Sequence, residues 1–174
     1  MKIEDIYQEL KKKDYNLLFN RNNLNIYQSG NCFLIYGNIN INKNKLLDKL
    51  LNPKLDSIIK IEEISKNINY VKIKLNSQFI DYPIIDRIEE VTKYEINNKT
   101  FIYNKFKDVS VEIKDKQCLE FVEYIESGYF LINIEEINQQ SRIEIFIVDL
   151  DLKSELIIPF VKNFSLIINE LKNI

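Results

Sequence analysis

Hydrophobic residues recur along the chain with two different periods. At the start, a spacing of three and four residues predicts an amphipathic helix carrying Ile3, Ile6, Tyr7 and Leu10, closed by lysines at 11–13. A second such stripe, from Phe160 to about residue 171, predicts a C-terminal helix with Pro159 near its first turn. Shorter stripes predict helices over 46–51 and over 116–126, the latter between Asp115 as N-cap and Gly128.

Between these helices, apolar and polar residues alternate, which is typical of half-buried strands. Strands are predicted over 33–41, 58–64, 71–75, 87–96, 100–106, 109–114, 129–134 and 142–150. Asn97-Asn98-Lys99 predicts a tight hairpin, because Asn tolerates positive φ. Residues 145–148 are apolar on both faces, so the last strand should be central in its sheet, whereas the Asn-rich residues 20–31 read as a loop.

Consecutive strands with short connections favour antiparallel pairing. The sequence therefore predicts an α+β fold. We expect one domain over residues 1–174, with a mainly antiparallel sheet of six to eight strands and N-terminal, central and C-terminal helices packed on it.

The composition bears on function mainly because it excludes several classes of catalytic, nucleotide-binding and metal site. Ile, Asn and Lys occupy 74 of 174 positions and Ala, His and Trp are absent, which indicates an AT-rich genome. Without His there is no Ser-His-Asp or Cys-His pair. Three glycines cannot build a Walker A or dinucleotide turn, and two cysteines cannot close a four-thiolate zinc site. We therefore expect no cofactor and, more readily than an enzyme, a non-catalytic protein. Cys32 and Cys118 are expected to be buried free thiols.

Carboxylate chemistry survives this exclusion. Residues 145–151, an apolar strand ending in Asp149-Leu150-Asp151, superficially resemble the first motif of haloacid-dehalogenase-like phosphotransferases. The resemblance implies a magnesium-dependent enzyme using Asp149 and Asp151, although only 23 residues follow for the later motifs of that family. A solvated acidic turn is the alternative. The acidic pairs at 62–63, 89–90 and 135–136 are interpreted as solvated strand ends or turns.

Two surfaces are candidates for binding. In the predicted 116–126 helix, Glu120, Glu123, Tyr124 and Ser127 fall on the outward stripe, and a Tyr among carboxylates suits protein contact. On the predicted 71–75 strand and just before it, Tyr70, Lys72 and Lys74 offer an open face for nucleic acid or nucleotides. A net charge of −2 gives no broad field to attract nucleic acid.

The leading function prediction is a non-enzymatic protein-binding module of an AT-rich bacterium or its mobile element: an immunity protein, an inhibitor of a defence or toxin enzyme, or an adaptor chaperone. Nucleic-acid binding and the metal enzyme are the alternatives. We expect a protein partner, and a homo-oligomer through the C-terminal helix as one possibility. The N-terminus shows no apolar signal segment and residues 156–169 are too few to span a bilayer, so a cytoplasmic location without membrane contact is expected.

Overall fold

The computed structural model describes residues 2–21, 23–51, 58–75, 84–115 and 122–171. These ranges form four helices and ten strands. The helices are α1 (Ile3–Lys11), α2 (Lys43–Leu51), α3 (Val111–Asp115) and α4 (Ser154–Leu171). The strands are β1 (Asn16–Arg21), β2 (Leu24–Ser29), β3 (Cys32–Ile39), β4 (Ile58–Ser65), β5 (Ile68–Lys74), β6 (Ile84–Ile96), β7 (Lys99–Lys107), β8 (Val122–Ile125), β9 (Tyr129–Ile137) and β10 (Gln140–Val148).

The ten described strands form one sheet, in which nine follow the order β1-β2-β3-β10-β9-β7-β6-β5-β4 and β8 joins at β6. All neighbours in this order pair antiparallel, while the short β8 pairs parallel with the first four residues of β6. The prediction of six to eight strands was therefore wrong, although the fold is still α+β. The expected central position of the strand over 142–150 is confirmed, because β10 lies between β3 and β9.

Three local predictions failed. The range 20–31, expected to be an Asn-rich loop, contains the whole of β2, in which Leu24 and Ile26 are fully buried. The strand over 109–114 is wrong, because Val111–Asp115 form the short helix α3. The helix over 116–126 is wrong in its second half, where residues 122–125 form β8, while its first half and Cys118 lie outside the described residues.

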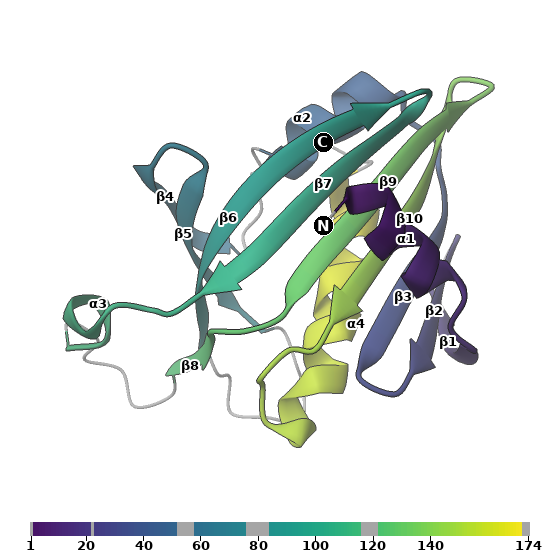
Figure 1. Ribbon diagram of the computed structural model, residues 1–174. Helices are drawn as coiled ribbons and strands as arrows, with labels where there is room; N and C mark the ends of the chain where they lie inside the picture. The colour runs from purple at the N-terminus through teal and green to yellow at the C-terminus, as the bar shows by residue number, and fades with distance from the viewer. Residues whose placement is uncertain (1, 22, 52–57, 76–83, 116–121, 172–174) are drawn as a thin grey trace.

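The larger hydrophobic core lies on the sheet face covered by α4 and α2, hereafter the α4 face, which is behind the sheet in Figure 1. Phe160 and Val161 of α4 and Leu46 of α2 are fully buried against strand residues such as Ile145. Burying a side chain of this size contributes about 1.5–3 kcal/mol, so this stripe is what holds α4 on the sheet. The helix begins at Ser154, which puts Pro159 in its second turn.

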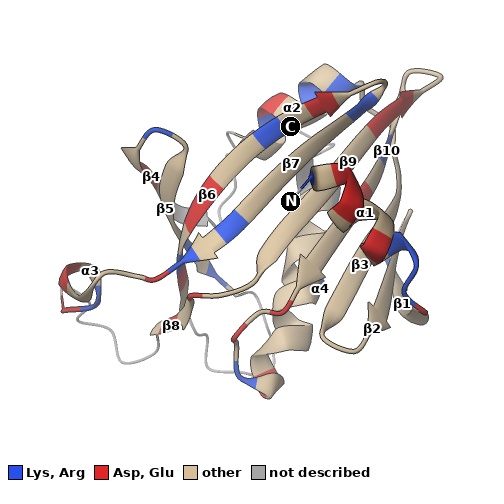
Figure 2. Ribbon diagram, in the orientation of Figure 1, with Lys and Arg blue, Asp and Glu red and all other residues tan. Residues whose placement is uncertain are grey.

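Helix α1 covers part of the opposite face, hereafter the α1 face, and lies in front of the sheet in Figure 1. Its buried stripe of Ile3, Ile6, Tyr7 and Leu10, as predicted, packs with Phe146 in a second core. Its first turn is acidic and its last turn is basic, a distribution visible in Figure 2 and favoured by the helix dipole.

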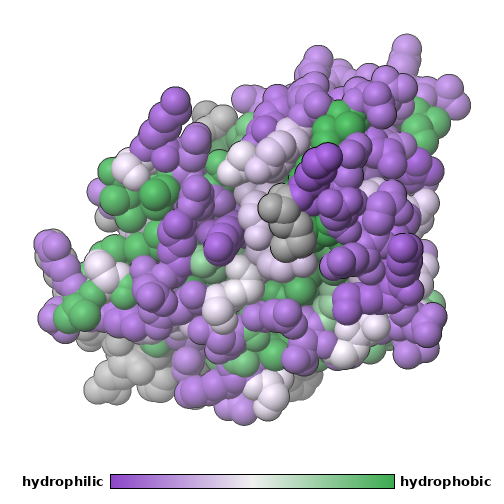
Figure 3. All heavy atoms as spheres, in the orientation of Figure 1, coloured by the Kyte–Doolittle hydropathy of each residue, from purple (hydrophilic) through white to green (hydrophobic). Residues whose placement is uncertain are grey.

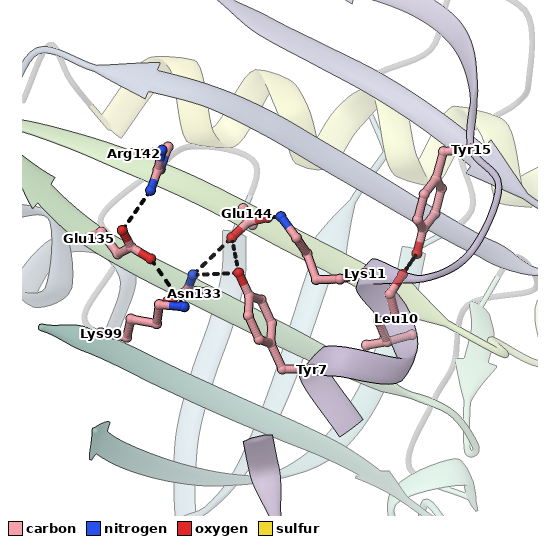
Figure 4. A network of polar contacts seen from close by, with 9 residues as sticks. All are labelled: Tyr7, Leu10, Lys11, Tyr15, Lys99, Asn133, Glu135, Arg142 and Glu144. Carbon is pink, nitrogen blue, oxygen red and sulfur yellow. Dashed lines mark hydrogen bonds and ion pairs between the residues drawn. The ribbon is translucent and has the colours of Figure 1, made fainter. Parts of the chain in front are cut away.

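A buried carboxylate fixes α1 to the sheet (Figure 4). Glu144 of the central strand β10 is 3% exposed and accepts hydrogen bonds from the Tyr7 hydroxyl at 2.6 Å, Lys11 Nζ at 2.7 Å and Asn133 Nδ2 at 2.9 Å. Burial acts to raise the pKa of Glu144, but the three donors outweigh it and lower the pKa. The carboxylate therefore stays charged and joins α1, β9 and β10.

Candidate ligand-binding cavity

An internal cavity of about 110 Å³ lies between the sheet and α4. Most of its wall is apolar and comes from β5, β7, β9 and the C-terminal half of α4, for example Val71, Ile102, Ile132, Phe164 and Ile168. These strand residues face inward because alternate side chains of a strand point to the same side of the sheet. The fold therefore encloses an apolar space of its own.

One part of the cavity wall is polar and charged. Arg87 and Glu89 of β6 are 8% and 7% exposed, and Arg87 Nε donates a hydrogen bond to Glu89 Oε2 at 3.1 Å. Asn104 of β7 also lines the cavity and its Nδ2 donates to the same Glu89 oxygen at 3.3 Å. The predicted solvated strand end at 89–90 is thus wrong for Glu89, which is buried beside the cavity.

Two polar atoms of this group have unused hydrogen-bonding capacity. Among the described residues, none accepts a hydrogen bond from Arg87 Nη1 and none donates one to Asn104 Oδ1, although both atoms are buried. The Arg87 guanidinium instead lies over the rings of Phe106 and Phe130, with Cζ 5.8 Å and 5.7 Å from their centroids. An unsatisfied buried donor costs about 1–3 kcal/mol, so a partner for it would bind favourably.

The cavity reaches the surface where α2 ends and β4 begins the sheet edge. Leu51 and Ile61 both line it and are 42% and 41% exposed. Figure 3, which shows the α1 face, has further apolar atoms on the surface around β4, where Ile64 is also exposed, and around α3, where Val111 is 72% exposed, but neither residue lines the cavity. Leu51 and Ile61 thus give the cavity an apolar rim, across which an apolar molecule could enter.

The predicted protein-contact stripe is not a helical face. Glu120 lies outside the described residues, and Glu123 and Tyr124 belong to β8. Tyr124 is half-buried against the small core of Tyr70, Ile88 and Val109, with Lys114 Nζ 4.9 Å from its ring centroid. Glu123 accepts a hydrogen bond from Lys153 at 2.9 Å, and Ser127 is exposed. Tyr124 and Ser127 therefore do not share the stripe that helical spacing gave them.

The predicted nucleic-acid surface is partly closed. Tyr70 is 6% exposed and its hydroxyl donates to Asp86, a fully buried carboxylate. Lys72 Nζ lies 3.7 Å from the same carboxylate, and Lys74 is exposed at the end of the strand. Burial raises the pKa of Asp86, although Tyr70 and Lys72 oppose the rise. Tyr70 therefore offers no open ring for a base.

Asp149 and Asp151, the predicted metal ligands, have different structural roles. Asp149 occupies the left-handed region at φ 53°, and Asp151 Oδ1 accepts hydrogen bonds from the backbone N–H groups of Glu126 and Ser127 at 3.0 and 3.2 Å. Among the described residues, no group of three His, Cys, Asp or Glu side chains could hold a metal ion. The acidic turn caps the connection between β8 and β9.

Sequence reasoning assigned Glu89 to a solvated strand end and gave no role to Arg87 or Asn104. A signal existed, because the chain has only three arginines and Arg87 shares strand parity with the apolar Val91. A charged residue on the apolar face of a strand is rarely buried without function or partner.

Comparison with solved structures defines the fold. Human STARD10 superposes with a TM-score of 0.71 at 9% identity, over 97% of this chain and 77% of that one. The lipid transfer and protein localization domain of human StarD13 gives 0.61 at 12% identity, over 98% and 93%. A STAR-related lipid transfer protein of Xanthomonas axonopodis gives 0.62 at 10% identity, over 91% and 98%. No protein-family model and no curated sequence matches the chain.

The chain therefore has the fold of the StAR-related lipid transfer proteins. This finding overturns the function predicted from the sequence, an immunity protein, inhibitor or mobile-element product, because three of the solved structures with this fold are named as lipid transfer proteins or domains. No described helix has the length and apolar character needed to cross a membrane.

Proposed function

We propose that this protein binds a lipid or lipid-like molecule in the cavity between its sheet and α4. The observation that carries the proposal is an apolar internal cavity with a buried, incompletely satisfied polar group in its wall. Pockets that bind small molecules are mostly apolar with a few polar groups that fix orientation. The named lipid transfer function of three structures with this fold supports the same assignment.

The polar group favours a ligand whose polar end is uncharged. The charges of Arg87 and Glu89 cancel within an ion pair that is almost fully buried. A ligand carboxylate or phosphate would bring an unbalanced charge into this environment, which is costly. Arg87 Nη1 is a free donor and Asn104 Oδ1 a free acceptor among the described residues. A hydroxyl group both accepts and donates, so it complements the two atoms together.

The size of the cavity favours a compact apolar part. An engineered cavity of about 150 Å³ binds benzene, and the present cavity of about 110 Å³ is of the same order. A longer chain would enter only with displacement of half-buried wall residues such as Leu50 and Phe164.

Titration with hexanol and cyclohexanol, and with carboxylates of equal carbon number, tests the proposal. Binding is measured by calorimetry in the parent and in Ile132→Phe, which fills the cavity. The matched control is Ile137→Phe, the same change on the same strand at a residue 43% exposed. We expect alcohols to bind more tightly than carboxylates and Ile132→Phe to bind at least about tenfold more weakly. No alcohol binding, or equal binding by both variants, would refute the proposal.

A further inference from the structure

The α1 face carries a second hollow, separate from the cavity under α4. It has a volume of about 250 Å³ and lies where α1 meets β3, β7, β9 and β10. Its lining is polar: Lys11, Lys99 and Arg142 provide cations, Glu135 and Glu144 provide carboxylates, and Tyr36 adds a hydroxyl. Figure 4 shows these charged side chains converging from α1, β7, β9 and β10.

The cations form the rim and the carboxylates form the floor. The side chains of Lys11, Lys99 and Arg142 are 44%, 38% and 35% exposed, whereas those of Glu144 and Glu135 are 4% and 17% exposed. A solute approaching from water therefore meets the cations first. Three cations above two carboxylates leave one net positive charge in the hollow.

The carboxylate oxygens are already in use. Glu144 accepts from Tyr7, Asn133 and Lys11, and Glu135 accepts from Arg142 Nη2 at 2.7 Å with Lys99 Nζ at 3.7 Å. Burial opposes ionisation of Glu135, but the bond from Arg142 and the other positive neighbours lower the pKa of Glu135. Both carboxylates therefore stay charged and paired.

The cations, by contrast, have donors to spare. An ammonium has three N–H groups and a guanidinium five. Lys11 makes one hydrogen bond to Glu144. Arg142 bonds to Glu135 through Nη2 and also bonds to the side chain of Tyr36, which leaves further N–H groups of the guanidinium unused. The Lys99 ammonium is too far from Glu135 for a good hydrogen bond and lies 5.0 Å from the centroid of the Tyr7 ring. The hollow thus offers a surplus of charged donors and few free acceptors, which suits an oxyanion and disfavours a metal cation or an apolar group.

We propose that this hollow is a binding site for a small phosphate-type oxyanion, held by Lys11, Lys99 and Arg142. The anion belongs either to a soluble phosphate ester or to a phosphate headgroup at a lipid surface, since both present the same acceptors. The site does not depend on the ligand under α4, because it lies on the other face of the sheet.

Calorimetric titration with glycerol phosphate tests the site, with sodium chloride at matched ionic strength as the reference. The variant is Lys99→Gln, which removes the cation with the longest ion pair. The matched control is Lys93→Gln, a lysine 44% exposed in an ion pair with Glu95 and outside the hollow. We expect the parent and Lys93→Gln to bind equally and Lys99→Gln to bind about tenfold more weakly, the value of one charge-assisted contact. Thermal unfolding without ligand checks that each variant is folded.

Vesicles of phosphatidylcholine with and without phosphatidic acid separate the two sources of phosphate. Binding of phosphatidic acid vesicles that Lys99→Gln alone loses supports the site and assigns it to a headgroup. Binding of glycerol phosphate without vesicle binding supports it and assigns it to a soluble ester. A response that follows ionic strength alone, or an equal loss in Lys93→Gln, would overturn the proposal. None of these outcomes alters the alcohol titration, so the two proposals fail separately.

Discussion

Replacing one partner of the Arg87–Glu89 ion pair should destabilise the protein strongly, whereas replacing both partners should destabilise it much less. Both side chains are 9% exposed in an ion pair of 3.1 Å on one strand. Replacing Glu89 by Leu leaves the guanidinium buried without its counter-charge. Replacing both, as Arg87→Met with Glu89→Leu, leaves neither charge behind and keeps apolar volume in the wall of the cavity.

The magnitudes follow from burial. Loss of one partner of a buried pair costs about 3–5 kcal/mol, because the remaining charge is uncompensated. The double replacement avoids that term, and what it loses is mainly the contact of Arg87 with Phe106 and Phe130, worth about 2 kcal/mol at a desolvated site. We therefore expect the single variant to lose about 4 kcal/mol of unfolding free energy and the double variant no more than about 2 kcal/mol.

Urea denaturation followed by circular dichroism measures these free energies. A matched control lies six residues further along β6, where Lys93 and Glu95 form the same i, i+2 pair at 3.2 Å but are 44% and 58% exposed. Glu95→Leu should change stability by less than about 1 kcal/mol. A double variant destabilised as much as Glu89→Leu would refute the reasoning, because the ion pair itself would then make a net contribution to the free energy of unfolding.

Three further predictions concern the α1 face and the turns. Tyr7→Phe should lose about 1.5–3 kcal/mol in thermal or urea unfolding, because Glu144 loses a charge-assisted donor, while Tyr94→Phe, at a residue 39% exposed, should be neutral. The pKa of Glu144 is lowered from 4.5, so its contribution is complete above pH 4.5 and is lost as the pH falls below it; in acid titrations of stability, Glu144→Gln should flatten that fall, and an unchanged slope would contradict us. Gly128→Ala should cost about 2 kcal/mol or more, since φ is +95° and a Cβ would meet Val148 O at 2.5 Å, whereas Gly30→Ala at φ +57° has open space and should cost about 1 kcal/mol.

Long-period patterns in this sequence predict structure well where one face of an element is buried. The stripe of α1 is read correctly because its buried positions repeat over several turns, and β9 and β10 are read correctly because each contains a long run of buried residues. β2 was missed because Asn25 alternates with Leu24 and Ile26 inside a run rich in Asn, a composition that indicates loops. The genome bias in composition therefore hid a strand.

The secondary structure of the short segments depends on the elements that they contact. Residues 122–125 become a strand because β7 pairs with β6 only from Ile88 onward, which leaves residues 84–87 of β6 free to pair with β8. Val111 was expected inside a strand, yet it is 72% exposed in α3. No local pattern reports such tertiary effects.

The cavity could not be predicted for a related reason. Arg87 and Asn104 lie on different strands, and only the pairing of β6 with β7 brings them to the same wall. The signal in the sequence was that the charged Arg87 points to the same side of its strand as the apolar Val91. Alternation along one strand does not reveal which side of the sheet a helix covers.

The pairing of β3 with β10 has a consequence for how the chain folds during synthesis. The pairs run from Ile39 with Ser141 to Cys32 with Val148, so the partners in every pair are more than a hundred residues apart in the sequence. Contacts of such long range form late and slow folding, since the loop between them must first be closed. On the ribosome, β1, β2 and β3 would therefore wait as a three-stranded meander with Leu24, Ile26 and Ile35 uncovered until β10 and α4 emerge, an interval in which aggregation competes with folding.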